Sequence, residues 1–383
     1  MNEEKQICER CIYDSSISRI TFDDEGICNY CRQIEDLQVE YGTGEEKGIK
    51  TFELILEKIK TSGKGKKYDC VIGVSGGTDS SYMLLKAIDW GLRPLAVHYD
   101  NTWNAAVATM NIEKVTSATN IDLYTYVVNN KEHDDIKKAF LYASVPEFDA
   151  DTDIAYIQVL RMVAAKFGVK YIFEGHSYHE EGLTPVGSNY LDGGYVSSIH
   201  NNHGSIKRKS FPNMTFYQFL KWTIIYKQEF IRPFWYIEYT KEKARQELID
   251  RTGWIYYGGH HLENRASSFA HLSWLPKKFG IDYRNLTLSA KVRNGKLSRQ
   301  SALAEYSIPA KEDDNLIYYV KKRLGISDAE YDEIFSKPNK SWKDYKTYKK
   351  RFEALRPLFY ILAKNKRVPM SFYLKYCFPL SDE

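Results

Sequence analysis

The chain lacks the features of several common protein classes. No apolar run approaches the roughly 18 residues that a membrane-spanning helix needs, and residues 1–6 lack the apolar core of a signal peptide. Six cysteines are few for 383 residues, so a disulfide-rich scaffold is not indicated. The net charge of +4 is small for this length, so it does not indicate a nucleic-acid partner. We therefore predict a cytoplasmic globular protein with no membrane span, long enough for two or three domains.

The strongest motif also lacks something, namely the Gly-Lys-Ser/Thr ending of a Walker loop. An apolar strand runs into Ser75-Gly76-Gly77-Thr78-Asp79-Ser80-Ser81, and a helical pattern follows at once. The glycine turn and the helix N-terminus offer backbone N–H groups to an anion, and Asp79 could hold Mg²⁺ beside phosphates. The alternative is an ordinary glycine-rich turn with a Ser/Asp cap. The segment resembles the pyrophosphate-binding loop (PP-loop) of ATP pyrophosphatases, whose signature is SGGxDS.

Four of the six cysteines form a regular pattern, Cys8-x₂-Cys11-x₁₆-Cys28-x₂-Cys31. This spacing is typical of a four-thiolate zinc site, which is structural because no ligand position stays open for substrate. Residues 19–26 alternate and then turn, which predicts a zinc-ribbon hairpin. Disulfides are the alternative, but cytosolic thiols stay reduced.

Apolar strands alternate with helices from residue 68 to 175, which predicts an α/β fold with an open parallel sheet and helices on both faces. We expect strands at 69–74, 94–99, 122–128 and 170–174, and helices at 79–90, 104–118, 132–142 and 153–167. Residues 177–215 are expected to form long loops over the site, and the chain from 217 onward to be mostly helical. The predicted domains are a zinc ribbon (1–45), a PP-loop ATP pyrophosphatase domain (46–240) and a helical substrate or partner region (241–383).

Ligands of open parallel sheets bind beyond the carboxyl ends of the strands. Besides the PP-loop, two predicted strand ends carry reactive side chains, at His98-Tyr99-Asp100-Asn101 and at Glu174-Gly175-His176. A glutamate and a histidine beside bound ATP could handle a proton or ammonia. A helix cap at Asp100 and a solvated loop histidine are the alternatives. The acids of Asp149-x-Asp151-x-Asp153 could ligate a metal, but the dipole of the following helix explains them more simply.

A late stretch, Gly253-Trp254-x₂-Tyr257-Gly258-Gly259-His260-His261-x-Glu263, is dense in glycine, aromatic and ionisable residues. Together with the Cys-x₂-Cys-x-Tyr-Asp ribbon, the SGGTDSSY loop and the His-x-Asp-x₂-Trp-Asn strand end, it resembles the N-acetyl sugar amidotransferase family. The runs Leu275-Pro276-x-Lys278-Phe279-Gly280 and Gly295-x-Leu297-Ser298-Arg299-x₂-Ala302 also match that family. The resemblance covers about residues 1–305 and leaves 310–383 without an assigned role.

The resemblance implies an enzyme that uses ATP, Mg²⁺ and ammonia to convert an N-acetyl group on a bacterial surface sugar, free or nucleotide-linked, into an acetamidino group, as in lipopolysaccharide O-antigen biosynthesis. It also implies a separate glutaminase and an ammonia-channelling synthase-like subunit, since the chain shows no glutaminase signature. The expected ATP-binding residues are Ser75, Gly76, Gly77, Thr78, Asp79, Ser80, Ser81, His98, Asp100 and Gly175. The expected catalytic residues are Asp79, Glu174, His176 and Glu263, and the expected substrate-binding residues are Trp103, Asn104, Tyr257, Gly258, Gly259, His260 and His261.

This chain departs from the family at His260, where the family has lysine. If that lysine balances phosphate charge, His260 could do so only when protonated, and Lys277, Lys278 or Arg299 could supply the charge instead. A tRNA-thiolating enzyme is the main alternative, but only Cys70 and Cys377 remain for sulfur transfer and neither lies in a reactive context. Another amide-forming PP-loop ligase is a further alternative. A non-enzymatic zinc-ribbon scaffold is disfavoured because Asp79 and Ser80 are intact.

Overall fold

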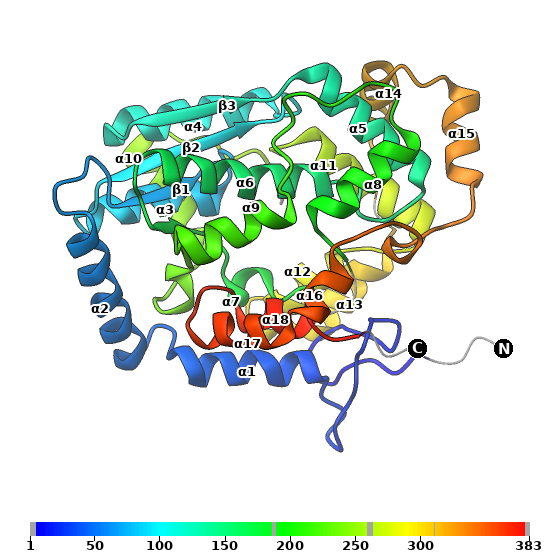
Figure 1. The fold of residues 1–383 in the computed structure, drawn as a ribbon. Helices are drawn as coiled ribbons and strands as arrows, with labels where there is room; N and C mark the ends of the chain where they lie inside the picture. Colours follow the sequence, from blue (N-terminus) through cyan, green and yellow to red (C-terminus); the bar gives the residue numbers. More distant parts are fainter. Residues whose placement is uncertain (1–4, 186–188, 259–262, 310, 380–383) are drawn as a thin grey trace.

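The computed structural model describes residues 5–185, 189–258, 263–309 and 311–379, and its centre is a five-stranded parallel sheet (Figure 1). The strand order is β3-β2-β1-β4-β5. The strands are β1 (Cys70–Gly73), β2 (Pro94–Asp100), β3 (Leu123–Val127), β4 (Tyr171–Phe173) and β5 (Glu229–Ile231). The predicted open parallel α/β sheet is therefore confirmed. The prediction missed β5, because three residues are too few to show alternation and only pairing with β4 makes them a strand.

Helices cover both faces of the sheet, as predicted. The first four strands alternate with α3 (Thr78–Asp89), α4 (Ala106–Thr119), α5 (Asn130–Ala143) and α6 (Ala150–Lys166). Because successive strand residues point to opposite faces, Ile72 packs with α3, α4, α2 (Glu46–Ser62) and α10 (Lys241–Thr252), whereas Val71 packs with α6. The carboxyl ends of the parallel strands all lie at one edge, which brings the predicted loops together.

The C-terminal region is mostly helical, as predicted, and forms a large apolar cluster with α5, α8 (Gly193–His203) and α9 (Phe216–Leu220). Its other elements are α11 (Arg265–Phe269), η3 (Ala270–Phe279), α12 (Arg284–Arg293), α13 (Arg299–Ser307), α14 (Asp314–Leu324), α15 (Asp328–Ser336), η4 (Trp342–Asp344), α16 (Lys349–Ala354), α17 (Arg356–Lys364) and α18 (Met370–Tyr376). Residues 342–364 do not form one helix, since the chain breaks at Leu355, two residues before Pro357.

Several other elements also differ from the expectation. Residues 177–215 are not only loop, because they contain α7 (Tyr178–Glu181) and α8. Two π-helices, η1 (Lys221–Ile225) and η3, extend α9 and α11, and η2 (Pro233–Trp235) is a short 3₁₀ turn after β5. No helix among the described residues is long and apolar enough to cross a bilayer.

The N-terminal segment is a loop that carries Cys8, Cys11 and Cys28 and leads directly into α1 (Asn29–Tyr41), which carries Cys31. The predicted turn forms, with Gly26 at φ +73° donating to the Asp23 carbonyl at 2.9 Å. Its strands are reduced to two isolated bridges, Ile7 with Asp14 and Phe22 with Cys28. The segment docks on α12 and α13, where Arg299 Nε donates to the carbonyls of Cys8 at 2.8 Å and Cys11 at 3.2 Å.

Candidate active site

The PP-loop segment is a tight turn between β1 and α3, and its serine hydroxyls form hydrogen bonds with backbone N–H groups of the same turn. The Ser75 hydroxyl accepts from the Gly77 N–H at 3.2 Å, and the Ser80 hydroxyl accepts from the Ser75 N–H at 3.2 Å. Gly76 has φ +81°, and a Cβ there would lie 2.2 Å from the Ala108 carbonyl oxygen. Glycine is therefore required at Gly76 both by its conformation and by the close approach of α4. The predicted residues Thr78 and Ser81 lie buried in the first turn of α3.

The late Trp-Tyr-Gly segment docks onto this turn. The Gly76 carbonyl accepts from Trp254 Nε1 at 3.0 Å and from Asn111 Nδ2 at 3.3 Å. Asn111 also bonds both backbone groups of Ile255, each at 2.8 Å, so the amide joins α4 to this segment. Two motifs that are 180 residues apart in the chain therefore form one structure.

Tyr257 and Glu263 reach the start of α3 from this late segment. A Cβ added to Gly77 would lie 3.1 Å from Glu263 Oε1 and 3.2 Å from the Tyr257 hydroxyl oxygen. Burial and the nearby Glu263 carboxylate raise the pKa of Tyr257 well above its usual range, so its hydroxyl stays protonated. Gly258 follows with φ +96°, whereas Gly259, His260 and His261 lie outside the described residues.

Asp79 contacts a cation from another part of the chain. Lys241 Nζ, at the start of α10, lies 3.2 Å from Asp79 Oδ2 and 3.0 Å from Glu181 Oε1, and the Tyr239 hydroxyl donates to Asp79 Oδ1. The three charged side chains are 23%, 13% and 17% exposed for Asp79, Lys241 and Glu181. Burial and repulsion from Glu181 raise the pKa of Asp79 to about 6, against the attraction of Lys241. This cluster is thus a pair of carboxylates that share one lysine at the solvent edge.

The side chains at the end of β2 are held in place by hydrogen bonds within the protein. His98 Nδ1 donates to the Val74 carbonyl at 2.9 Å, and Asn104 donates to His98 Nε2 at 3.2 Å, so the imidazole is neutral. Burial lowers the pKa of His98, which agrees with that state. Asp100 accepts from the Thr102 N–H at 2.7 Å, an Asx turn. His98 and Asp100 therefore shape the end of β2, and their contact with ATP stays a prediction.

Trp103 and Asn104 differ in access. Trp103 is fully buried, with its indole N–H donating to Asp134 at 2.9 Å and Arg323 stacked on its ring at 4.2 Å. Its side chain thus packs in the core, so a substrate role for this side chain is not what the structure shows. Asn104 is partly buried and accepts from Asn264 Nδ2 at 3.1 Å, which ties β2 to the residue after Glu263.

The end of β4 contacts the PP-loop helix directly. A Cβ added to Gly175 would lie 3.0–3.2 Å from the Asp79 backbone and Cβ, so a side chain at this position would push Asp79 away. Glu174 pairs with Arg232, which follows β5, at 2.7 Å. His176 Nδ1 accepts from Trp235 Nε1 at 3.2 Å, so its Nε2 carries the proton and donates to the Gly182 carbonyl at 3.2 Å. Burial lowers the pKa of His176, which makes it a neutral group beside the site.

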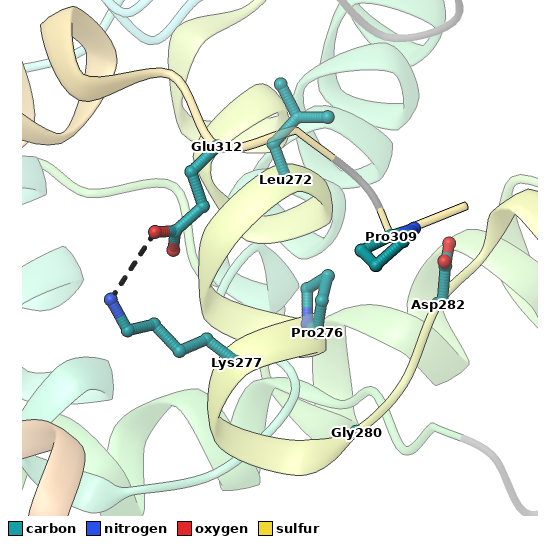
Figure 2. Close-up of a pocket in the computed structure, with 7 residues that line it drawn as sticks. All are labelled: Leu272, Pro276, Lys277, Gly280, Asp282, Pro309 and Glu312. Carbon is teal, nitrogen blue, oxygen red and sulfur yellow. Dashed lines mark hydrogen bonds and ion pairs between the residues drawn. The ribbon is translucent and has the colours of Figure 1, made fainter. Parts of the chain in front are cut away.

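The basic residues that sequence analysis named as substitutes for a lysine at position 260 each make contacts with other parts of the chain, so their role in balancing phosphate charge stays a prediction. Figure 2 shows Lys277 pointing toward Glu312, with which it pairs at 3.5 Å beside a surface pocket of about 390 Å³. Lys278 is buried and donates to the carbonyls of residues 334, 335 and 337 at 2.8–3.1 Å. Arg299 binds the cysteine knuckle, as described above. Among the described residues, Lys241 is the cation that pairs with Asp79 of the PP-loop, and the sequence analysis did not consider it.

The acids before α6 belong to a buried structural cluster. Lys137 Nζ contacts Asp149 at 2.5 Å and Asp151 at 2.8 Å, and His133 Nε2 lies 2.9 Å from Asp151. Although burial opposes ionisation, Lys137 lowers the pKa of Asp149 to about 2. Lys137 pairs with both carboxylates, so the simpler of the two interpretations, without a metal, describes them.

The four cysteines fit one tetrahedral ion. They are fully buried, and their Sγ atoms all lie within 4.8 Å of one another, with Cys8–Cys31 at 3.9 Å and Cys11–Cys28 at 3.8 Å. A tetrahedron with Zn–S bonds of about 2.3 Å has edges of about 3.8 Å, whereas an iron–sulfur cluster holds its thiolates further apart. Arg293 Nη1 lies 3.8 Å from the Cys31 sulfur and supplies positive charge beside the thiolates. The set is suited to structural zinc.

Sequence analysis missed several residues of the site, namely Asn111, Glu181, Arg232, Tyr239, Lys241 and Trp254. Glu181 and Lys241 each lie at one end of a helix, in segments that carry no motif of their own. The only signal was the Tyr239-Thr240-Lys241 run before a helix, in which Thr240 is the N-cap. Trp254 was part of a recognised motif, but its contact with Gly76 requires the fold.

Comparison with known proteins supports the resemblance that the sequence motifs indicated. Residues 263–357 match the C-terminal domain of WbpG-like LPS biosynthesis proteins, which confirms the resemblance to a surface-polysaccharide family. An uncharacterized protein of Methanocaldococcus jannaschii is 30% identical over 172 residues, 44% of this chain and 58% of the archaeal protein. This chain therefore matches little more than half the length of that relative.

Two solved structures are similar over most of their length but at low scores. NMN synthetase from Francisella tularensis has 12% identity and a TM-score of 0.33, covering 74% of this chain and 95% of the synthetase. NH₃-dependent NAD synthetase from Campylobacter jejuni has 14% identity and a TM-score of 0.31, covering 76% and 98%. Scores of this size say nothing about the activity of the chain.

Proposed function

We propose that this chain is an ATP-dependent amidotransferase that replaces the N-acetyl carbonyl oxygen of a bacterial surface sugar with nitrogen from ammonia, releasing AMP and pyrophosphate. The main support for this proposal is the arrangement at the carboxyl edge of the sheet. Three parts of the chain meet there: the PP-loop turn, the Asp79–Lys241–Glu181 cluster, and the segment that carries Tyr257 and Glu263. The match of residues 263–357 to a domain of LPS biosynthesis proteins supports a sugar as the acceptor.

The chemistry follows from the weakness of an amide as an electrophile. Its oxygen is a poor leaving group, so that oxygen first attacks the α-phosphorus of ATP and displaces pyrophosphate. Ammonia then adds to the carbon of the O-adenylyl imidate, and AMP leaves with the former carbonyl oxygen as the amidine forms. The protein's part in both steps is positioning and charge compensation.

The residues at the loop suit a triphosphate. The N–H groups at the start of α3 and the Ser75 and Ser80 hydroxyls can donate to the β- and γ-phosphates. Lys241 is held by two carboxylates and can turn its charge to a phosphate when a cation takes its place between them. Oxygen ligands of Asp79 and Glu181 fit Mg²⁺, which would neutralise the charge of the departing pyrophosphate.

The acceptor side of the site is proposed at Glu174, Glu263 and Tyr257. Glu263 and Tyr257 flank Gly77, and Glu174 extends from the adjacent strand end. Glu263 can hold an incoming ammonium ion and take its proton, since its carboxylate is partly buried beside the protonated Tyr257 hydroxyl. His176 is fixed as a neutral orienting group. We further propose that ammonia comes from a separate glutaminase through a synthase-like subunit.

The test is product analysis with purified protein, ATP, Mg²⁺, ammonium at alkaline pH and a panel of N-acetylated sugars and their nucleotide forms. The expected result is equal amounts of AMP, pyrophosphate and a sugar whose mass has changed by O to NH. Lys241→Met should abolish most of this turnover, because it leaves two carboxylates unbalanced. Lys277→Met is the matched control, since Lys277 pairs with Glu312 away from the loop.

Two outcomes would contradict the proposal. Release of ADP and phosphate would exclude adenylylation. AMP formation only with tRNA and a sulfur donor would favour the thiolation alternative. The structure supports that alternative poorly, because Cys70 and Cys377 are fully buried and burial raises the pKa of both thiols, to about 11 for Cys377.

A further inference from the structure

The C-terminal end of the chain has a charge very different from the rest. Residues 337–379 contain twelve lysines and arginines and two acids, a net charge of +10, whereas the whole chain carries only +4. The remainder is therefore net acidic. Such an asymmetry indicates an anionic partner for this part of the molecule.

The same part exposes large apolar side chains. On α17, Ile361 is 57% exposed and Tyr360 45%, although the opposite side of the helix already buries Phe359 and Leu362. On α18, Leu374 is 58% exposed and Met370 40%. A surface helix normally presents polar residues to water, so a helix that is apolar on both sides lacks a partner on its outer side.

The π-helix η1 extends this surface. Ile225 is 70% exposed, and Ile224 and Tyr226 are exposed beside it. The two regions touch, because Arg367 donates to the Lys227 carbonyl at 3.0 Å. They also share an aromatic base, in which Phe219 packs on Phe359 and Phe372 with ring centroids 6.1 and 5.2 Å apart. We call the exposed set the C-terminal apolar face: Ile224, Ile225, Tyr226, Tyr360, Ile361, Met370 and Leu374.

Lysines surround this face. Lys221, Lys227, Lys364 and Lys366 are exposed and form no ion pair with any described residue. Lys364 Nζ lies 5.5 Å from the centre of the Tyr360 ring, and Lys221 Nζ lies 5.5 Å from that of Tyr226. The positive charges therefore lie directly beside the apolar side chains and not on a separate surface.

We propose that the C-terminal apolar face and its lysines dock this protein on an anionic membrane surface. Aliphatic and aromatic side chains would enter the boundary between headgroups and acyl chains, and the lysines would meet acidic headgroups. The composition favours lipid over other partners, since protein interfaces are depleted in lysine and single-stranded nucleic acid is bound by stacking aromatics rather than by isoleucine and leucine. Docking there would bring the enzyme to the membrane surface without inserting a helix.

The test is flotation of the full chain with vesicles of phosphatidylcholine alone or mixed with phosphatidylglycerol. We expect binding to the mixed vesicles only, weakened by salt. The double variant Ile361→Glu/Leu374→Glu should lose about tenfold or more in binding, and Lys364→Glu/Lys366→Glu a similar factor, since each lysine near an anionic surface contributes about fivefold. Leu54→Glu is the matched control, because Leu54 is 66% exposed on α2 and should not affect binding.

The proposal is wrong if the wild-type chain does not bind the mixed vesicles, or if Leu54→Glu weakens binding as much as the double variant. Salt-sensitive binding to tRNA that the lysine variant loses and the Ile361/Leu374 variant keeps would overturn it in favour of a nucleic-acid surface. Thermal melting checks that the variants are folded. We expect unchanged melting temperatures, since the four substituted side chains (Ile361, Leu374, Lys364 and Lys366) are exposed. Turnover with a water-soluble sugar should stay unchanged in these variants, so failure of the docking proposal is distinct from failure of the proposed function.

Discussion

Two clusters of one lysine and two carboxylates lie in different parts of the fold and behave in opposite ways. Lys137 is fully buried with Asp151 and pairs closely with Asp149, so the pKa of Asp149 falls to about 2. Lys241 lies at the solvent edge, further from Asp79 and Glu181, and the pKa of Asp79 rises to about 6. Asp149 and Asp79 are equally exposed, at 23% each, so exposure of the carboxylate alone does not decide the direction.

The difference comes from the donors that surround each pair of carboxylates. Lys137 gives its three donors to Asp149, Asp151 and the Phe148 carbonyl, and His133 adds to Asp151. Lys241 lies between two carboxylates that repel each other; among the described residues, the Tyr239 hydroxyl donates to Asp79, and His176 Nε2 lies 3.9 Å from Glu181 Oε2. The first cluster is enclosed in the core and is therefore structural, whereas the second lies beside the PP-loop helix and suits a divalent cation and a phosphate.

The largest effect is expected from Lys137→Met. Removing the lysine leaves two buried carboxylates without a partner, which costs about 3–5 kcal/mol of unfolding free energy. Urea denaturation followed by circular dichroism measures it, and the AMP-forming activity per folded molecule should stay near that of the wild type. A stable Lys137→Met protein that had lost ATP binding would show that this cluster is functional after all.

Asp79→Asn should have the reverse profile. Loss of the metal carboxylate is expected to lower AMP formation by about 10²–10³-fold, while the protein melts at the same temperature or higher. Pyrophosphate release and differential scanning fluorimetry give the two quantities. Activity within a factor of two of the wild type would remove Asp79 from the proposed mechanism.

The pH dependence of stability should have opposite signs for the two acids. Because the folded-state pKa of Asp79 is raised, its ionised form costs folding free energy above pH 6, and that cost vanishes as the pH falls toward 4. Asp149, with its pKa lowered, stabilises the fold above pH 4 and loses this as the pH falls toward 2. At pH 7.5 we expect Asp79→Asn to stabilise and Asp149→Asn to destabilise, each by about 1–2 kcal/mol.

Melting curves of both variants and the wild type from pH 4 to 8 measure this contrast. The stabilisation by Asp79→Asn should disappear by about pH 4, whereas the Asp149→Asn protein should remain destabilised there. If both variants changed the stability in the same direction at pH 7.5, the two clusters would be electrostatically alike.

The smallest effect is expected from Tyr239→Phe. The ring stacks on Phe234 with centroids 4.0 Å apart, so the fold should be retained, while Asp79 loses a hydrogen-bond donor that lowers its pKa. The acid limb of the activity profile should shift to higher pH, with about 2–10-fold lower activity near pH 6. Tyr82→Phe is the control, because the Tyr82 ring also packs on Phe234, at 6.0 Å, whereas its hydroxyl bonds Glu247 instead of Asp79. An unchanged profile would show that the Tyr239 hydroxyl does not influence Asp79.

The sequence alone determined the elements whose signal is local. The strand-to-helix turn at Ser75–Ser81 was predictable because glycine spacing, hydroxyls and an apolar strand occur within a few residues. The cysteine knuckles were predictable for the same reason, since a tetrahedral ion demands short, fixed spacings. The β1 to β4 pattern and its helices followed from periodicity, and the strand ends therefore had to share one edge.

Only the tertiary structure decided which charges meet. Lys241 and Glu181 have no motif around them, and a lysine's partner depends on which helix ends come within about 3 Å after folding. The same holds for Trp103, whose burial could not be inferred from its place beside a strand end, and for β5, which exists only through pairing with β4. Local propensity acts over a few residues, whereas charge compensation and burial act through space, so the candidate nucleotide loop was visible in the sequence and its balancing lysine was not.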